Sequence, residues 1–379
     1  MFSKYRIPFN RPTQSEWDSE YLQQALSSGK LSGDGNFTAR CHHILEQVVG
    51  VPKALVTTSC THALEMAALL LDIKEGDEVI VPAFTFVSSA NAFVLRGARP
   101  VFADIRPDTM CIDEGHLEQL ITPRTRAIVA VHYAGVSCEM DTISALALNS
   151  GACVIEDNAH GLFGSYRGRM LGSLGRMATL SFHETKNLTC GEGGALLVND
   201  ATLIERAEII REKGTDRSKF FRGQVDKYGW VDIGSSYLPS EVLAALLCAQ
   251  LEDRQRIQQC REVIWVKYHE MLKKWAVDRG VTLPTVPPSC AQAFHMFYML
   301  MPSASAREKL IAHLGAKGIL AVWHYQPLHT SKVGKMYGGQ DGDCPVAERV
   351  AEQLVRLPFY TTMTDEEQLM VVEALYELV

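Results

Sequence analysis

The stretch Cys153-Val154-Ile155-Glu156-Asp157-Asn158-Ala159-His160 places a short apolar run directly before two carboxylates. Similar runs recur between about residues 51 and 200, and most of them are followed by a helical pattern. The other runs are ALVTT (54–58), DEVIVP (77–82), PVFAD (100–104), AIVAVHY (127–133), ATLSF (178–182) and GALLVN (194–199). Short apolar runs that alternate with amphipathic helices are typical of parallel strands covered on both faces. The sequence therefore predicts an α/β fold with a mainly parallel sheet.

The pattern changes after Asp200. We expect a helix over 201–213, a polar loop punctuated by glycine over 217–234, and one long helix over 239–274. The segment VTLPTVPPSC (281–290) is broken by prolines and resembles a crossing into a second domain.

The C-terminal part predicts a smaller unit. Helical patterns over 306–317 and 364–378 flank short apolar runs, which indicates a small α+β domain. A chain of 379 residues is too long for one small core. We therefore expect a large domain over residues 1–250, including the N-terminal segment, and a linking helix with a small domain over 251–379.

Composition narrows the possible partners. The net charge of -7 argues against a dominant basic groove for nucleic acid. No apolar run is long enough to span a membrane, and the sequence MFSKYRIPFNRP (1–12) has no following apolar stretch, so we expect no secretion signal. The ten cysteines contain no Cys-x-x-Cys pair, which favours free thiols in a cytoplasmic protein. The twelve histidines contain no HExxH, so we expect no metal site.

The carboxylate of Asp157 suggests a cofactor site. Pyridoxal phosphate (PLP) needs a carboxylate beneath its pyridine nitrogen, because a protonated nitrogen makes the ring an electron sink. A strand that ends in Asp157 would deliver such a group to the carboxyl edge of the sheet, where ligands bind. A helix cap, a metal ligand and a ribose ligand are open alternatives for this residue.

A lysine follows the next strand. Ser181-Phe182-His183-Glu184-Thr185-Lys186-Asn187 comes about thirty residues after Asp157 and precedes the glycine-rich turn CGEGG (190–194). Burial and neighbouring charge would lower the pKa of such a lysine and let its amine attack a carbonyl. The alternative is a solvated loop lysine, but the glycine-rich turn favours close approach of the backbone to a ligand.

The stretch Thr57-Thr58-Ser59-Cys60-Thr61 closes a strand and opens a helix. Unpaired N–H groups at a helix N-terminus bind anions, and the hydroxyl groups add donors. An ordinary Ser/Thr helix cap is equally consistent with this stretch. Together with Asp157 and Lys186, however, it completes the order of phosphate site, carboxylate and lysine that a PLP enzyme requires.

These motifs resemble the DegT/StrS family of nucleotide-sugar aminotransferases nearly end to end. The segments that carry the resemblance are GKLSGDGNFT (29–38), TTSCTHALEMAALLL (57–71), VPAFTFVSSANAFVLRGARPVFADI (81–105), VHYAGVSCEMD (131–141), EDNAHG (156–161), SFHETKN (181–187), GEGGAL (191–196) and HYQPLH (324–329). The resemblance implies the fold-type I architecture of PLP-dependent transferases, with a seven-stranded type of sheet in the large domain.

The resemblance also implies roles for individual residues. Lys186 would hold PLP through a Schiff base, Asp157 would pair with the pyridine nitrogen and His160 would lie near the ring. Cys60, Thr61 and Ser181 match the positions that hold the cofactor phosphate. Phe86 matches the aromatic residue that stacks on the pyridine face, with Phe84 as the alternative.

Two further expectations concern the substrate and the partner subunit. Tyr325 and His329 would contact the sugar, with His324 as a less favoured candidate and a core role as the alternative for His329. Many members carry G-x-N-Y-R where this chain has Gly234-Ser235-Ser236-Tyr237-Leu238, and that asparagine reaches the phosphate across a homodimer. Ser236 is shorter, which leaves this contact open, although a homodimer is still expected.

The implied reaction is transamination of a nucleotide-linked keto-sugar with L-glutamate. Within the family, SGKLSGDGNFT (28–38), RPDTMCIDE (106–114), REKGT (211–215) and FFRGQVDKY (220–228) most resemble enzymes that act on dTDP-4-keto-6-deoxy-D-glucose. Transamination of a UDP-linked sugar or of a 3-keto-sugar and a non-catalytic PLP-binding regulator are alternatives. Lys186 argues against a sugar dehydratase, and the lack of GxGxxG after the first strand argues against an NAD enzyme.

Overall fold

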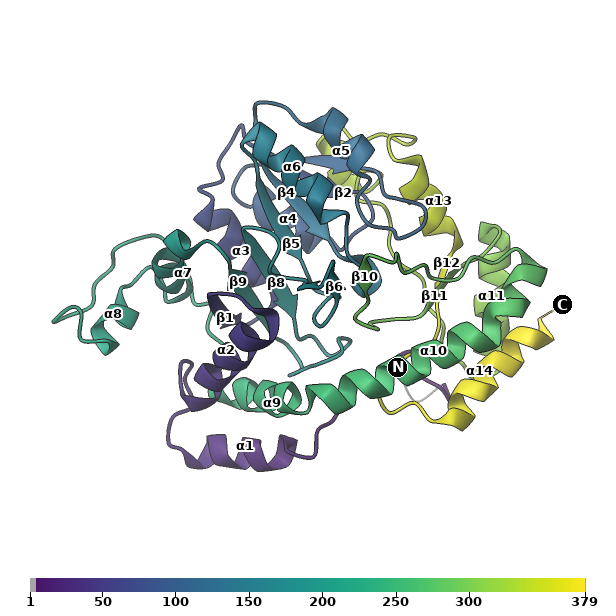
Figure 1. Cartoon of the computed structure of the whole chain (residues 1–379), viewed down its shortest axis with the longest axis horizontal. Coiled ribbons are helices and arrows are strands. Elements are labelled where there is room, and N and C mark those ends of the chain that lie inside the picture. Colours follow the sequence, from purple (N-terminus) through teal and green to yellow (C-terminus); the bar gives the residue numbers. More distant parts are fainter. Residues whose placement is uncertain (1–4, 379) are drawn as a thin grey trace.

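A seven-stranded sheet forms the centre of the large domain (Figure 1). The computed structural model describes residues 5–378. The spatial order of the strands is β1-β9-β8-β5-β4-β2-β3. Their bounds are β1 Lys53–Thr57, β2 Glu78–Pro82, β3 Arg99–Ala103, β4 Thr125–Val131, β5 Cys153–Asp157, β8 Met177–Ser181 and β9 Gly194–Val198.

The sheet is mainly parallel, as the sequence predicts. Strand β9 pairs antiparallel with β1 and with β8, whereas β8, β5, β4, β2 and β3 pair in parallel. Six strands therefore run in one direction, and the carboxyl ends of β1, β5 and β8 lie at the same edge. The seven strands that the apolar runs predict are all present, which confirms the α/β fold.

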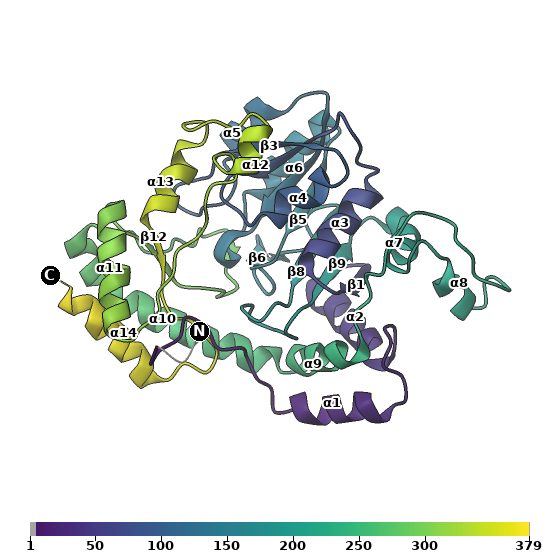
Figure 2. The ribbon, with the colours of Figure 1, turned by 180° about the vertical axis from the view of Figure 1, so that it is seen from behind.

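Helices cover both faces of the sheet because successive strand residues point to opposite sides. Along β4, Ile128 and Ala130 belong to one core cluster, whereas Val129 and Val131 belong to another. The helices of the first cluster include α5 (Glu114–Leu120) and α6 (Met140–Ser150), and those of the second include α3 (Cys60–Leu70) and α4 (Ser88–Val94). Helices α2 (Asn36–Val49) and α9 (Glu241–Glu252) pack over β1, β8 and β9 (Figures 1 and 2).

The predicted long helix over 239–274 is two helices. Helix α9 ends at Glu252, and α10 (Arg254–Arg279) begins after Asp253 and continues toward the C-terminal part of the chain (Figure 2). The ψ angle of 7° at Asp253 interrupts the helical ladder, and the helical sequence pattern does not signal this break. The predicted loop over 217–234 contains the short helix α8 (Arg217–Phe221), which projects away from the sheet (Figure 1).

A second core lies at the C-terminal end of the chain. Helices α10, α11 (Ala304–Ala316) and α14 (Asp365–Glu377) pack around two antiparallel strands, β11 (Tyr298–Leu300) and β12 (Leu354–Arg356). Ile7 is fully buried in this core and bridges Ile319, so the start of the described chain packs with the small domain. The division of the chain after residue 250 stays a prediction.

Shorter elements complete the structure. They are α1 Asp18–Ser27, η2 Tyr133–Gly135, β6 Ser165–Tyr166, β7 Arg169–Met170, η3 Ala201–Leu203, α7 Ile204–Arg211, β10 Cys290–Ala291, α12 Lys332–Met336 and α13 Pro345–Gln353. In residues 5–378, no helix combines the length and the apolar character needed to cross a bilayer. The same residues contain no cluster of three or more metal-ligating side chains.

Glu156 stabilises the loop that follows β5. Its side chain is fully buried, and its two carboxylate oxygens accept hydrogen bonds from the backbone N–H groups of Gly172, Leu174 and Gly175 at 2.6–2.7 Å. His132 donates a fourth hydrogen bond through Nε2 at 2.9 Å, since its Nδ1 accepts from the N–H of Cys138. One carboxylate therefore joins the ends of β4 and β5 to the turn before β8.

We expect Glu156→Gln to lower the free energy of unfolding by about 3 kcal/mol. The amide has one acceptor oxygen, so at least two buried donors lose their partner, and each costs about 1–3 kcal/mol. Urea unfolding of the apoprotein measures the change. Glu308→Gln, at a side chain that is 73% exposed, is the control and should change stability by less than about 0.5 kcal/mol. Equal stability of the two variants would contradict this role for Glu156.

Candidate active site

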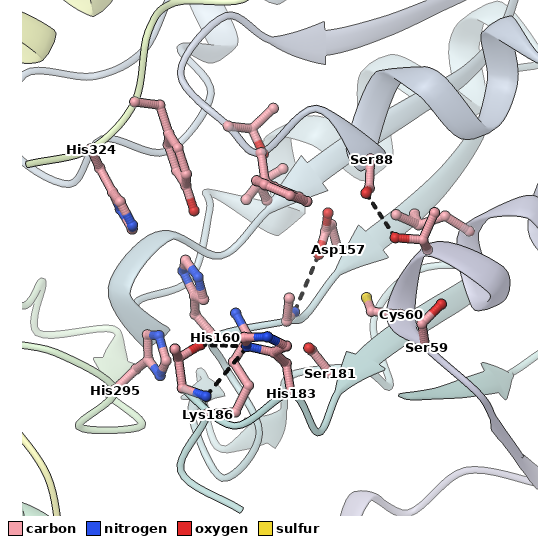
Figure 3. Close-up of a pocket in the computed structure, with 18 of the residues that line it drawn as sticks. Ser59, Cys60, Ser88, Asp157, His160, Ser181, His183, Lys186, His295 and His324 are labelled. Carbon is pink, nitrogen blue, oxygen red and sulfur yellow. Dashed lines mark hydrogen bonds between the residues drawn. The ribbon is translucent and has the colours of Figure 1, made fainter. Parts of the chain in front are cut away.

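A cavity of about 600 Å³ lies at the carboxyl edge of the sheet (Figure 3). Its wall brings together most of the residues that the sequence singles out, although they are spread over the chain. Those that line it are Cys60, Thr61, Phe86, Asp157, His160, Ser181, Lys186, His324 and Tyr325. The carboxyl ends of β1, β2, β5 and β8 supply all of this set except His324 and Tyr325, which explains why residues far apart in sequence meet here.

Asp157 is the last residue of β5 and is buried. Its Oδ2 accepts a hydrogen bond from Ser89 Oγ at 2.6 Å, and its Oδ1 accepts one from the N–H of Ala159 at 3.2 Å. Both donors are neutral, so among residues 5–378 no cation is hydrogen-bonded to this carboxylate. The arrangement suits a carboxylate that pairs with a positively charged ligand atom.

Lys186 enters the cavity from the loop between β8 and β9 (Figure 3). Burial lowers the pKa of its ammonium group to about 8, and the charge of Arg356 acts in the same direction, whereas Cys60 and Asp157 oppose the shift. At pH 8 about half of the molecules would therefore carry a free amine. A lysine with this property is suited to nucleophilic attack on a carbonyl and to proton transfer.

The N-terminus of α3 forms one end of the cavity. Ser59 caps the helix by accepting a hydrogen bond from the N–H of His62, which leaves the N–H groups of Cys60 and Thr61 without an intrahelical acceptor. Thr61 Oγ1 lies 2.8 Å from Ser88 Oγ. These hydroxyl and N–H groups, with the dipole of α3, make a site for an anion such as phosphate.

Gly194 allows the sheet to approach this helix. A Cβ atom at this position would lie 2.3 Å from the backbone nitrogen of Cys60. Gly194 pairs with Ser181 in the sheet and is the last glycine of the turn CGEGG. The glycine-rich turn thus permits the close contact between β9 and the N-terminus of α3.

The structure distinguishes the two phenylalanines. Phe84 is fully buried in the core beneath the cavity, with its ring 5.4 Å from that of Tyr133. Phe86 lines the cavity and is 57% exposed. Of the two, Phe86 is therefore the one that can stack on a flat ligand in the cavity.

Two predicted residues lie outside the cavity. His329 is fully buried and hydrogen-bonded to Glu348 at 2.8 Å, in accord with the core role that the sequence leaves open. Ser236 is exposed beside Lys30, Lys213 and other polar residues of a separate groove of about 180 Å³. Within its own chain, Ser236 does not contact the cavity.

Arg356 and His295 line the cavity but were not expected from the sequence. Arg356 ends β12 and is buried, His295 is buried near the start of β11, and each is a polar residue within an otherwise apolar run. A polar side chain in such a run is the signal that could have revealed them. Among residues 5–378 no carboxylate forms an ion pair with Arg356, which instead contacts His324. Burial lowers the pKa of the Arg356 guanidinium.

The donor set fits PLP. Asp157 offers a carboxylate for the pyridine nitrogen, Lys186 an amine of lowered pKa for the aldehyde, and the start of α3 an anion site for the phosphate. His160 is buried beside them with an unpartnered Nδ1, and burial lowers the pKa of its imidazole well below the usual value. The ring therefore stays neutral and can face a flat ligand.

Comparisons with known proteins agree with this geometry. The model of the DegT/DnrJ/EryC1/StrS aminotransferase family matches residues 12–376. GDP-perosamine synthase of Escherichia coli O157:H7 is 32% identical over 379 residues, which cover 98% of each protein. The PLP-form structure of a sugar aminotransferase from Streptococcus pneumoniae is 27% identical, with a TM-score of 0.90 over 98% of each chain. The aminotransferase PseC of Helicobacter pylori, involved in the biosynthesis of pseudoaminic acid, is 26% identical, with a TM-score of 0.87 over 98% of each chain.

We expect borohydride reduction of the PLP-loaded protein to fix the cofactor on the peptide that contains Lys186. The rate at which PLP is captured by the apoprotein should rise with pH and level off above about pH 8, because only the free amine attacks the aldehyde. Below pH 7 the rate should fall about tenfold per pH unit. Stopped-flow absorbance measures the rate, and Lys335→Ala, at a lysine whose side chain is 51% exposed and lies outside the cavity, is the control. Label on another lysine would refute the assignment.

Proposed function

Since the chain belongs to the DegT/DnrJ/EryC1/StrS family and is a PLP-dependent sugar aminotransferase, we propose that it aminates dTDP-4-keto-6-deoxy-D-glucose at C4. The amino donor would be L-glutamate, and the products dTDP-4-amino-4,6-dideoxy-D-galactose and 2-oxoglutarate. The observation that carries the proposed transamination chemistry is the convergence of Lys186, Asp157 and the N-terminus of α3 on one cavity. The amino sugar would serve a cell-surface polysaccharide such as enterobacterial common antigen.

Lys186 would move the protons in both halves of the reaction. PLP, when bound, supplies an electron sink that stabilises negative charge on the carbon next to the transferred nitrogen. In the first half, Lys186 Nζ removes the proton from Cα of the amino donor, and in the second it delivers a proton to C4 of the sugar. A pKa near 8 allows the same group to act as base and as acid near neutral pH.

Asp157 and the start of α3 would orient the cofactor. The hydrogen bonds from Ser89 and Ala159 leave further lone pairs of the Asp157 carboxylate available to a pyridine N–H. The N–H groups of Cys60 and Thr61, with Ser181, would hold the phosphate at the other end. The Asp157 carboxylate attracts a positive group and the start of α3 attracts a negative one, so together they would set the direction in which the cofactor ring lies.

Arg356 would bind a carboxylate of the amino donor. Its guanidinium lies in the cavity wall without an acidic partner among the described residues, and its Nε has no hydrogen-bond acceptor. A buried cation without a partner is costly, and a carboxylate that accepts two N–H groups from one guanidinium would satisfy it. This arrangement supports an α-amino acid as the donor.

The identity of the sugar rests on sequence resemblance. The segments SGKLSGDGNFT, REKGT and FFRGQVDKY most resemble enzymes for the dTDP-linked 4-keto-sugar. The relative GDP-perosamine synthase is named for a sugar linked to GDP and not to dTDP, so a GDP- or UDP-linked keto-sugar is the alternative substrate. Incubation of the purified enzyme with glutamate and each of the three nucleotide-linked 4-keto-sugars tests the proposal. NMR of the product should give turnover with the dTDP-sugar and an axial amino group at C4; turnover restricted to another nucleotide would refute it.

A homodimer would complete the site. Phe221 and Trp230 are 67% and 82% exposed, which is unusual for large apolar side chains and supports their burial against a second copy. Ser236 and Tyr237 would then lie near the cofactor of the partner subunit. Sedimentation velocity at micromolar concentration should give twice the mass of 42.0 kDa, and a fully active monomer would contradict this assembly.

We expect Arg356→Gln to raise KM for glutamate by about tenfold to a hundredfold. The substitution removes the charged hydrogen-bond donor for the carboxylate of glutamate, and such an interaction contributes about 1.5–3 kcal/mol to the free energy of binding. The affinity for PLP should change by less than about threefold, because the cofactor contacts at Asp157 and α3 remain. Initial-rate kinetics with varied glutamate and with varied sugar separate the two substrates. A rise confined to the KM of the sugar would assign Arg356 to that substrate instead.

A further inference from the structure

The ring of His295 lies directly against that of His160. The two imidazole centroids are 4.2 Å apart and the rings are inclined by only 14°, so they stack face to face. His160 comes from the loop after β5 and His295 from the approach to β11, so the stack joins the large domain to the chain of the small domain (Figure 3). Both side chains are buried, and both line the cavity.

Asn187 fixes the tautomer of His295. Its Nδ2 donates to the carbonyl oxygen of Ala293 at 2.7 Å, which sets the orientation of the amide and turns Oδ1 toward His295. The distance from Oδ1 to His295 Nδ1 is 2.9 Å. An amide oxygen only accepts, so Nδ1 of His295 must carry the proton and Nε2 is bare in the neutral ring. Asn187 directly follows Lys186, so this hydrogen bond also ties His295 to the loop of the lysine.

The backbone around His295 is held firmly. Phe294 has a φ of 49°, in the left-handed region that is unfavourable for a phenylalanine. The fully buried Arg261 of α10 donates to the carbonyl oxygens of Phe294 and His295 at 3.0 and 2.6 Å. A residue in such a strained backbone conformation persists where several surrounding contacts hold it in place, and residues of this kind are frequent at functional sites.

From these contacts we propose that His295, oriented by Asn187, is a positioning residue that backs the ring of His160 and fixes it against the cofactor. This inference rests on the proposed place of His160 beside PLP. His295 does not itself touch a reacting atom. It prevents the His160 ring from turning away from the cavity, since that ring has no hydrogen-bond partner at Nδ1 to hold it.

The stack requires neutral rings. Burial lowers the pKa of His295 well below its usual value, and the neighbouring charges of His160, Lys186, Arg261 and Arg356 lower it further. The pKa of His160 is lowered by burial and by Lys186, His324 and Arg356. A neutral pair also adds no positive charge beside Lys186, which favours the free amine of that lysine.

The first test reads the tautomer in the apoprotein. NMR of protein with ¹⁵N-labelled histidine, assigned by the signal lost in His295→Gln, should place the proton of His295 on Nδ1 at every pH between 6 and 8. Asn187→Asp should move His295 toward the imidazolium in the same range, because a carboxylate stabilises the doubly protonated ring. A proton on Nε2, or titration of wild-type His295 near pH 6.5, would overturn the proposal.

The second test distinguishes the positioning of the His160 ring by His295 from a general contribution of His295 to the stability of the fold. We expect His295→Phe, which keeps a flat ring, to retain kcat within about threefold, and His295→Ala to lower kcat at least tenfold with KM for glutamate within about twofold. His42→Ala is the control, since His42 is a half-buried imidazole that accepts a hydrogen bond from the N–H of Val56 and lies outside the lining of the cavity. If His295→Ala loses no more kcat than His42→Ala, or if His295→Phe fails equally, the stack does not position His160. Failure of the sugar assay or of Lys186 labelling would instead refute the proposed function.

Discussion

The alternation of side chains at the end of β5 is the constraint on which the rest of the site depends. Glu156 and Asp157 are adjacent carboxylates, and the pleat of the strand sends them to opposite faces of the sheet. Glu156 is satisfied completely by the chain, through three backbone N–H groups and His132. Asp157 is satisfied only in part, by Ser89 and Ala159. The network of Glu156 therefore fixes the strand end, and that strand end places the Asp157 carboxylate where a ligand can use it.

Much of this organisation can be predicted from the sequence because it is local. The apolar runs identify the seven strands, and the parallel arrangement then brings their carboxyl ends to one edge. Residues at those ends, such as Thr61, Asp157 and Lys186, meet in the cavity for that reason. The chemistry of a PLP site can thus be predicted before the packing is known.

The remainder depends on contacts between distant parts of the chain. Arg356 and His295 are more than 100 residues away from Asp157 in sequence, and only the packing of the small domain against the sheet brings them to the cavity. The sequence likewise does not indicate which of Phe84 and Phe86 lines the cavity, since this depends on which of the two side chains the core covers. His329 stands in a stretch that lines the cavity, yet its ring turns to Glu348. The break at Asp253 is a matter of one backbone angle within a pattern that is helical on both sides.

The wall of the cavity combines charged groups with neutral ones. Asp157 provides a carboxylate at the end of β5, and Lys186 and Arg356 provide positive groups, whereas the pKa values of His160 and His295 are lowered well below the usual range. Neutral histidines matter because each additional buried charge would act on the pKa of Lys186 at short range, where screening by solvent is weak. Burial lowers the pKa values of His160, His295 and His324, so these three rings add no positive charge beside the lysine near neutral pH. The imidazole rings of these three histidines therefore line the cavity without adding charge. The charged groups Asp157, Lys186 and Arg356 stay available to the cofactor and the substrates.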